Sequence, residues 1–151
     1  MTEPVRLAAG DRAPAFNLSD QTGTKHRLSH SKGRRVMVFF YPKANTGGCT
    51  TQACGLRDIA DEIGDVQIFG ISPDEPAAQA KWDAKHEFGF PLLSDPDGSA
   101  AKKFDVLSKR GPFSARVTFV IDSKGVIRHI DDGVNVDSHG EDLIEVIERL
   151  P

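Results

Sequence analysis

Apolar runs bounded by glycine, proline and aspartate alternate along this chain with segments of helical periodicity. Residues 35–41 form a continuous apolar run, as expected of a strand buried on both faces of a sheet, and residues 66–72 predict a second buried strand. A helical pattern lies between them over residues 50–63. Residues 75–88 predict another helix. Pro76 is compatible with this helix, since proline is tolerated in a first helical turn. This half of the chain therefore predicts a strand–helix–strand–helix unit.

Shorter elements are expected on both sides of this unit. They are an N-terminal hairpin of residues 15–18 and 25–28, a short strand at 91–93, a short helix at 99–104, strands at 116–122 and 126–130, and a closing helix at 141–150. The tight turn at 123–125 makes the last two strands antiparallel. A mixed sheet with helices on both faces fits this order best. The predicted class is therefore α/β, with the layout of a thioredoxin-like fold that carries an N-terminal hairpin extension and an insert after the second buried strand.

Composition and charge narrow the classes of function. A chain of 151 residues suits one domain spanning residues 1–151. The formal net charge is −3 and no basic block stands out, so we expect neither nucleic acid nor a membrane surface as partner. We expect no signal peptide, no membrane span and a cytoplasmic location. No phosphate-binding glycine motif is present, so no nucleotide cofactor is expected, and we assign no metal. In the cytoplasm, two cysteines point to redox or catalytic use.

The segment that carries chemistry is YPKANTGGCTTQACGLRD, residues 41–58. Cys49 follows a buried strand and a short loop, and it stands where a helix is predicted to begin. The positive end of a helix stabilises a negatively charged sulfur. Gly47 and Gly48 let the backbone approach a small ligand closely, and Thr46 can place a hydroxyl beside the sulfur. This pattern predicts a reactive thiolate.

A thiolate nucleophile also needs a fixed donor for the negative charge that develops on the leaving group. Arginine suits this role, because it stays charged and offers several N–H groups. Arg116 opens a predicted strand that should lie beside the strand at 35–41. From its position alone, Arg116 fits an exposed charge at a strand end equally well.

At this point the chain resembles the peroxiredoxin family. Pro42, Thr46 and Cys49 form the P-x-x-x-T-x-x-C pattern of the peroxiredoxin active site. Cys54 lies five residues later, which resembles the peroxiredoxin Q, or bacterioferritin comigratory protein, subfamily. Four further segments are similar to that subfamily in the same order: GDRAPAFNLSDQTG, FGISPDE, FGFPLLSDPDG and RVTFVIDSKGVIR. The similarity extends from about residue 10 to the closing helix.

The resemblance implies a role for each of these residues. Cys49 matches the peroxidatic cysteine and Cys54 the resolving cysteine. Thr46 and Pro42 match residues that hydrogen-bond and shield the site, and Arg116 matches the arginine that polarises thiolate and peroxide. The implied activity is reduction of hydrogen peroxide and organic hydroperoxides, with a thioredoxin-type dithiol as reductant, no cofactor and a monomeric chain.

Two positions depart from the usual family pattern. Gly47 stands where proline is common, and Gln52 stands where glutamate is frequent, which removes a charge near the site.

The spacing of the two cysteines limits when they can form a disulfide. Five residues apart on one regular helix, the Cα atoms of Cys49 and Cys54 would be about 8.7 Å apart. A disulfide needs about 4.4–6.8 Å. The helix must therefore unwind at its start in every cycle, and Gly55 weakens it there.

Other readings of the same residues stay open at the level of sequence. His26 and His30 are spaced H-x₃-H and the cysteines C-x₄-C, and both spacings fall within the range of zinc ligands. A thioredoxin-like disulfide exchanger is a second alternative, although its usual C-x-x-C motif is absent. A non-catalytic binding module on the same fold is a third. His86, His129 and His139 are expected at the surface or at helix ends.

Overall fold

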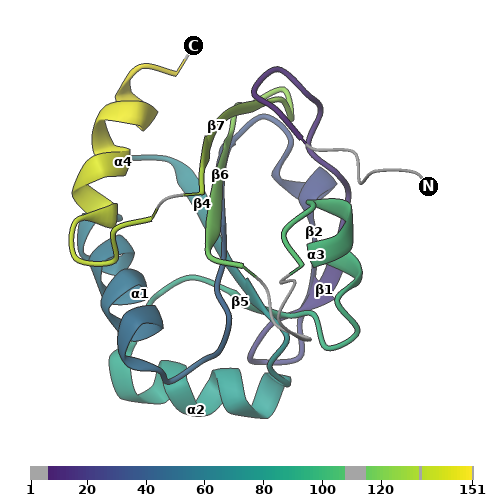
Figure 1. Cartoon of the computed structure of the whole chain (residues 1–151), viewed down its shortest axis with the longest axis vertical. Coiled ribbons are helices and arrows are strands. Elements are labelled where there is room, and N and C mark those ends of the chain that lie inside the picture. The colour runs from purple at the N-terminus through teal and green to yellow at the C-terminus, as the bar shows by residue number, and fades with distance from the viewer. Residues whose placement is uncertain (1–6, 108–114, 133, 151) are drawn as a thin grey trace.

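The centre of the protein is a five-stranded sheet with the strand order β5-β4-β3-β6-β7 (Figure 1). The computed structural model describes residues 7–107, 115–132 and 134–150. Its strands are β3 (Arg35–Phe40), β4 (Val66–Ser72), β5 (Leu92–Ser94), β6 (Val117–Ile121) and β7 (Ile127–Asp131). β3, β4 and β5 run parallel, whereas β6 is antiparallel to both of its neighbours. The predicted mixed sheet is confirmed.

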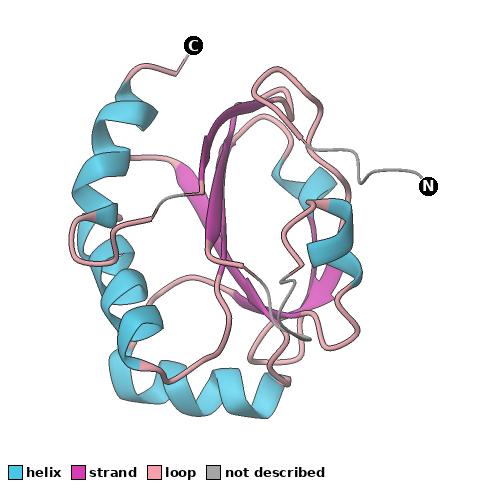
Figure 2. Ribbon diagram, viewed as in Figure 1, coloured by secondary structure: helices cyan, strands magenta, loops and turns pink. Residues whose placement is uncertain are grey.

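Helices cover both faces of this sheet (Figure 2). They are α1 (Gly47–Ile59), α2 (Pro76–His86), α3 (Ser99–Lys103) and α4 (His139–Glu148). α1 and α4 lie together on one face, and α3 lies on the other (Figure 1). Near α3, β1 (Asn17–Ser19) and β2 (Lys25–Arg27) form a separate antiparallel hairpin, followed by the 3₁₀ helix η1 (Leu28–Ser31). The expected N-terminal hairpin is thus present as its own two-stranded sheet.

The continuous apolar run of β3 has a physical reason, because its side chains enter two different cores. Met37 and Phe39 pack into the core that also contains residues of α1, α2 and α4. Val36 and Val38 pack into the opposite core with residues of α3 and β6. A strand that is buried on both faces cannot alternate apolar with polar residues. The central position of β3 in the sheet follows from this pattern.

The expected bounds of α1 were wrong at both ends. The helix begins at Gly47, three residues earlier than expected, because Thr46 is extended and its carbonyl accepts the Thr50 N–H group at 2.9 Å. It ends at Ile59, four residues earlier than expected, and the following residues form a turn to Gly64 with φ 75°. Cys49 therefore lies inside the first helical turn rather than in front of it.

The strand expected at residues 66–72 is confirmed with the same bounds as β4. The other elements differ from expectation by one or two residues at one or both ends, which is the usual uncertainty of helix and strand termini. Arg116 stands one residue before β6, and α4 begins at His139 instead of residue 141. Within the described ranges, no helix is both long enough and apolar enough to cross a membrane.

Candidate active site around Cys49

Cys49 occupies the third position of α1 and is completely buried. β3 ends at Phe40, and Pro42 lies in the loop that joins β3 to α1. The first N–H groups of a helix lack partners within the helix and carry partial positive charge. The fold thus places the Cys49 sulfur at the end of a helix where a thiolate is stabilised.

Arg116, the residue just before β6, reaches this sulfur. Its Nη2 donates a hydrogen bond to Cys49 Sγ at 3.4 Å, and its Nη1 donates to Gln52 Oε1 at 2.7 Å. The antiparallel pairing of β3 with β6, which sets Phe40 opposite Val117, brings Arg116 to the same end of the sheet as the β3–α1 loop. A half-buried arginine that binds a buried sulfur is more than an exposed charge at a strand end.

The two glycines before Cys49 have different surroundings. A Cβ atom at Gly48 would lie 3.3 Å from Arg116 Nη2, so a side chain there would press on the guanidinium. A Cβ atom at Gly47 would meet no described atom within 4 Å. Gly47 is the first residue of α1, a position where proline fits well. The departure at Gly47 therefore changes the stiffness of the loop without opening or filling the site.

Gln52 is a site residue that sequence reasoning missed. The sequence indicates only a lost charge at this position, yet the Gln52 side chain is fully buried and its Oε1 accepts the short hydrogen bond from Arg116. Its Nε2 has no hydrogen-bond partner within the described part of the chain. The available signal was its spacing, because residues three apart share one face of a helix. Gln52 and Cys49 together hold the two terminal nitrogens of Arg116.

Thr46 is the residue that precedes α1, and its hydroxyl does not cap that helix within the described residues. Thr46 Oγ1 instead donates to the carbonyl of Lys43 at 3.0 Å. The same loop is fastened to β4 through Asp74, whose carboxylate accepts the Ala44 N–H group at 2.6 Å and the Ser72 hydroxyl at 2.7 Å. These contacts fix the loop that carries Pro42 and Thr46 toward α1.

Cys54 lies on the same helix as Cys49, is half-buried, and both thiols are free. Its Sγ is 3.9 Å from Nδ1 of His86, the last residue of α2. His86 was expected at the surface or at a helix end, and it does end a helix. Its contact with Cys54 had no local signal, because 32 residues separate the two.

His139 begins α4, as expected of a helix-end residue, but it is not at the surface. Only 1% of it is exposed, and its Nε2 lies 2.9 Å from Thr118 Oγ1. Its Nδ1 is 3.5 Å from Asp131 Oδ2, which is longer than a good hydrogen bond. Burial lowers the pKa of His139, and the positive charge of Arg116 adds to this effect, whereas Asp131 and Asp142 oppose it.

Acid should therefore destabilise the protein through His139. The unfolded chain binds a proton at the ordinary histidine value of 6.5, and the folded chain binds it only at lower pH. We expect the free energy of unfolding to be fully retained above pH 6.5 and to decline as the pH falls below it. Urea unfolding at pH 7.5 and at pH 5 measures this loss, and His139→Gln should make it smaller. The exposed His30→Gln is the control, and an equal pH dependence in both variants would contradict the prediction.

The residues of the alternative zinc site are not brought together. His26 Nε2 is 2.7 Å from Asp20 Oδ2, in the hairpin region. Across residues 7–107, 115–132 and 134–150, no group of three or more potential ligands could hold a metal ion. The structure thus contains no arrangement of His26 with the two cysteines.

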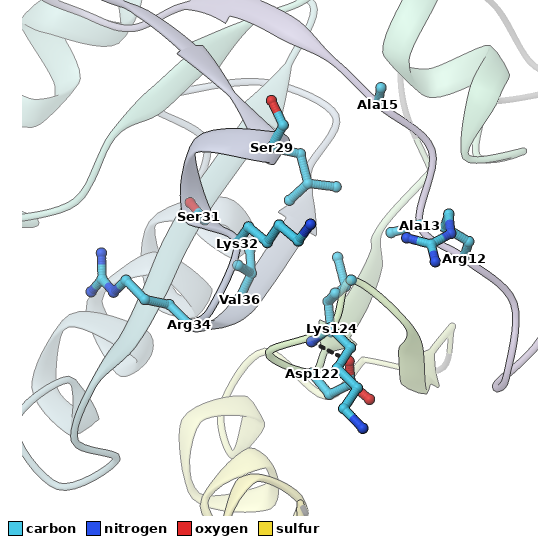
Figure 3. A pocket seen from close by; sticks show the side chains of 13 residues that line it. Arg12, Ala13, Ala15, Ser29, Ser31, Lys32, Arg34, Val36, Asp122 and Lys124 are labelled. Atoms are coloured by element: carbon cyan, nitrogen blue, oxygen red, sulfur yellow. Dashed lines mark hydrogen bonds between the residues drawn. The ribbon is translucent and has the colours of Figure 1, made fainter.

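Figure 3 shows a cavity of about 270 Å³. It lies near the start of β3, whereas Cys49 follows the other end of that strand. It is lined by Val36 at the start of β3 and by Ile121 at the end of β6, which face each other in the sheet register. The side chains of Arg12 and Lys32 approach it from opposite sides (Figure 3). Neither cysteine lines this cavity, so it is separate from the candidate active site.

A thioredoxin-like sheet that brings a buried cysteine in the first turn of a helix together with an arginine just before an adjacent strand is typical of a thiol peroxidase of the peroxiredoxin class. The chain belongs to the AhpC/TSA family, which matches residues 9–130. Membership implies a peroxide substrate and a thiol reductant.

The similarity extends to particular relatives. The chain is 41% identical to peroxiredoxin Bcp of Escherichia coli (strain K12), over 95% of this chain and 97% of that protein. The crystal structure of peroxidoxin BcpB from Mycobacterium tuberculosis matches with a TM-score of 0.87 and 36% identity, covering 95% of this chain and 97% of that one. Structures of the Xanthomonas campestris bacterioferritin comigratory protein, which concern its alkyl peroxide reduction activity, match with a TM-score of 0.82 and 28% identity, covering 88% and 90%.

Proposed function

We propose that this protein reduces hydrogen peroxide and organic hydroperoxides with Cys49 as the peroxidatic residue. The observation that carries the proposal is the hydrogen bond of 3.4 Å from Arg116 Nη2 to the buried Cys49 Sγ. The Cys49 thiolate attacks one oxygen of the peroxide, the O–O bond breaks, and Cys49 becomes a sulfenic acid. The other oxygen takes up a proton and leaves as water or an alcohol. The Arg116 guanidinium stabilises the negative charge that develops on this oxygen.

The other residues around the Cys49 sulfur bind the peroxide, shield the sulfur or position Arg116. Thr46 offers its hydroxyl to the bound peroxide, and Pro42 shields the sulfur from bulk water. Gln52 holds Arg116 through the hydrogen bond of 2.7 Å. Gly48 leaves the space that the guanidinium needs. In this assignment Cys49 and Arg116 act on the reacting atoms, and Gln52 positions Arg116.

Cys54 then closes the cycle as the resolving residue. Its sulfur attacks the sulfenic sulfur of Cys49, water leaves, and an intramolecular disulfide forms. A thioredoxin-type dithiol reopens this disulfide by thiol–disulfide exchange. The peroxide and the reductant are the partners of a chain that acts as a monomer in the cytoplasm.

Disulfide formation requires the start of α1 to unwind, because both cysteines belong to one helix. Opening the first turns breaks several backbone hydrogen bonds, each worth about 0.5–1.5 kcal/mol net, so the change is modest and reversible. It also releases the hydrogen bond of 3.0 Å from the Trp82 indole N–H to Thr50 Oγ1. Leu56, which is fully buried in this conformation, would gain exposure and offer the reductant an apolar contact.

The unwinding has a direct test in the two redox states. Oxidised protein should lose amide protection across residues 49–58, and the fluorescence of Trp82, the only tryptophan of the chain, should change. Cys54→Ser should react once with peroxide, stall as the sulfenic acid, over-oxidise more readily and show neither change. Hydrogen exchange and mass spectrometry measure these outcomes. Equal protection in both states, with the disulfide confirmed by mass, would contradict the unwinding.

A coupled assay tests the proposed activity as a whole. We expect consumption of hydrogen peroxide and cumene hydroperoxide in the presence of thioredoxin, thioredoxin reductase and NADPH. Insulin reduction in parallel tests the disulfide-exchange alternative. Reduction of insulin without peroxide turnover would replace the proposed function by protein disulfide exchange.

A further inference from the structure

The imidazole of His86 lies beside the second cysteine. His86 Nδ1 is 3.9 Å from Cys54 Sγ, and both side chains are half-buried. Only a thiolate is an effective nucleophile toward sulfur. The resolving thiol must therefore lose its proton, and the structure places His86 Nδ1 against it as a possible acceptor. Contacts of this kind are often long before reaction and shorten when the reacting groups come together.

Independent contacts hold the His86 ring in this place. The ring stacks on Phe88, with centroids 5.4 Å apart and an interplanar angle of 26°. The carbonyl of His86 accepts a hydrogen bond of 2.7 Å from Arg57 Nη1. Arg57 is three residues beyond Cys54 on α1, so this bond ties the end of α2 to the helix that carries the thiol. The geometry between ring and thiol is thus set by α1 and α2 together.

We propose that His86 is a catalytic residue of the resolving step, in which it accepts the proton of Cys54. The proposal rests on the proposed roles of Cys49 and Cys54. The neutral imidazole takes the thiol proton through Nδ1 while α1 is still intact. The Cys54 thiolate then attacks the sulfenic sulfur of Cys49, the S–S bond forms as the S–O bond breaks, and the leaving hydroxide takes a proton from the imidazolium. One water is released, the imidazole is regenerated, and no other oxidant or reductant is required.

The role is tested by separating the two chemical steps in stopped-flow experiments. Trp82 fluorescence and quenched mass spectrometry distinguish sulfenic acid formation from disulfide formation. His86→Gln and His86→Ala should form the sulfenic acid at the normal rate and the disulfide on the order of 10² more slowly, the usual contribution of acid–base catalysis. Both variants should over-oxidise more readily. His129→Gln, in β7, is the matched control and should behave as wild type.

Added imidazole distinguishes proton transfer from a purely structural role of His86, because free imidazole can replace a lost proton acceptor but not a lost packing contact. It should restore much of the disulfide-forming rate of His86→Ala and leave wild type unchanged. Normal disulfide formation in both His86 variants, or slow formation that imidazole does not restore, would overturn the proton-accepting role and leave the roles of the cysteines intact. Wild-type protein that forms no Cys49–Cys54 disulfide after reaction with peroxide would instead overturn the assignment of Cys54, and the role of His86 with it.

Discussion

Replacing Cys49 by serine is expected to reduce peroxide consumption to the uncatalysed background. A serine hydroxyl is not ionised at neutral pH and cannot be oxidised to a sulfenic acid, so neither the first step nor the disulfide is possible. Serine is close to cysteine in size, and the buried site should accept it with the fold intact. Peroxide loss in a ferrous xylenol orange assay measures the effect, and circular dichroism checks the fold.

Cys54→Ser is the matched control for this variant. It keeps the peroxidatic thiol, so without a recycling thiol it should consume one equivalent of peroxide rapidly, followed only by the slower consumption that over-oxidation causes. Appreciable turnover by Cys49→Ser would show that another group is the nucleophile. The pair therefore separates the attacking sulfur from the resolving one.

Replacing Arg116 by alanine is expected to slow the reaction of the thiol with peroxide on the order of 10²–10³, as does the loss of one donor to a developing negative charge. The variant loses the hydrogen bond to Cys49 Sγ and leaves Gln52 Oε1 without its donor. Arg116→Lys should be intermediate, because it keeps the charge but cannot bind both acceptors with one planar group. The second-order rate constant with hydrogen peroxide measures both variants.

An exposed arginine provides the control for general effects of charge. Arg27 lies in β2 and is exposed, so Arg27→Ala should leave the rate unchanged. An unchanged rate in Arg116→Ala as well would mean that the contact with Cys49 has no part in the chemistry. If only Arg116→Ala reacts more slowly, the loss of rate comes from the contact with Cys49 and not from a general change of charge.

Much of the fold could be predicted from the sequence, because the signals are local. A strand buried on both faces has to be apolar throughout, as at residues 36–40, and the short turn at 123–125 leaves only an antiparallel return. The candidate nucleophile was also local, since Thr46, Gly48 and Cys49 lie within four positions along the chain. The start of α1 could not be predicted from local signals. Glycine disfavours a helix in isolation, and the extended conformation of Thr46 decides where the helix begins.

Only the tertiary structure decided which distant groups meet the two thiols and which histidine is buried. Arg116 is 67 residues from Cys49, and it comes into contact through the register of β6 on β3. His86 meets Cys54 because α2 packs its last turn against α1, which no periodicity within either helix records. His139 looks like a surface residue by type, yet Thr118 from β6 and Asp131 from β7 surround it. Periodicity fixes the face that an element buries, whereas the pairing and packing of elements fix the groups that this face encounters.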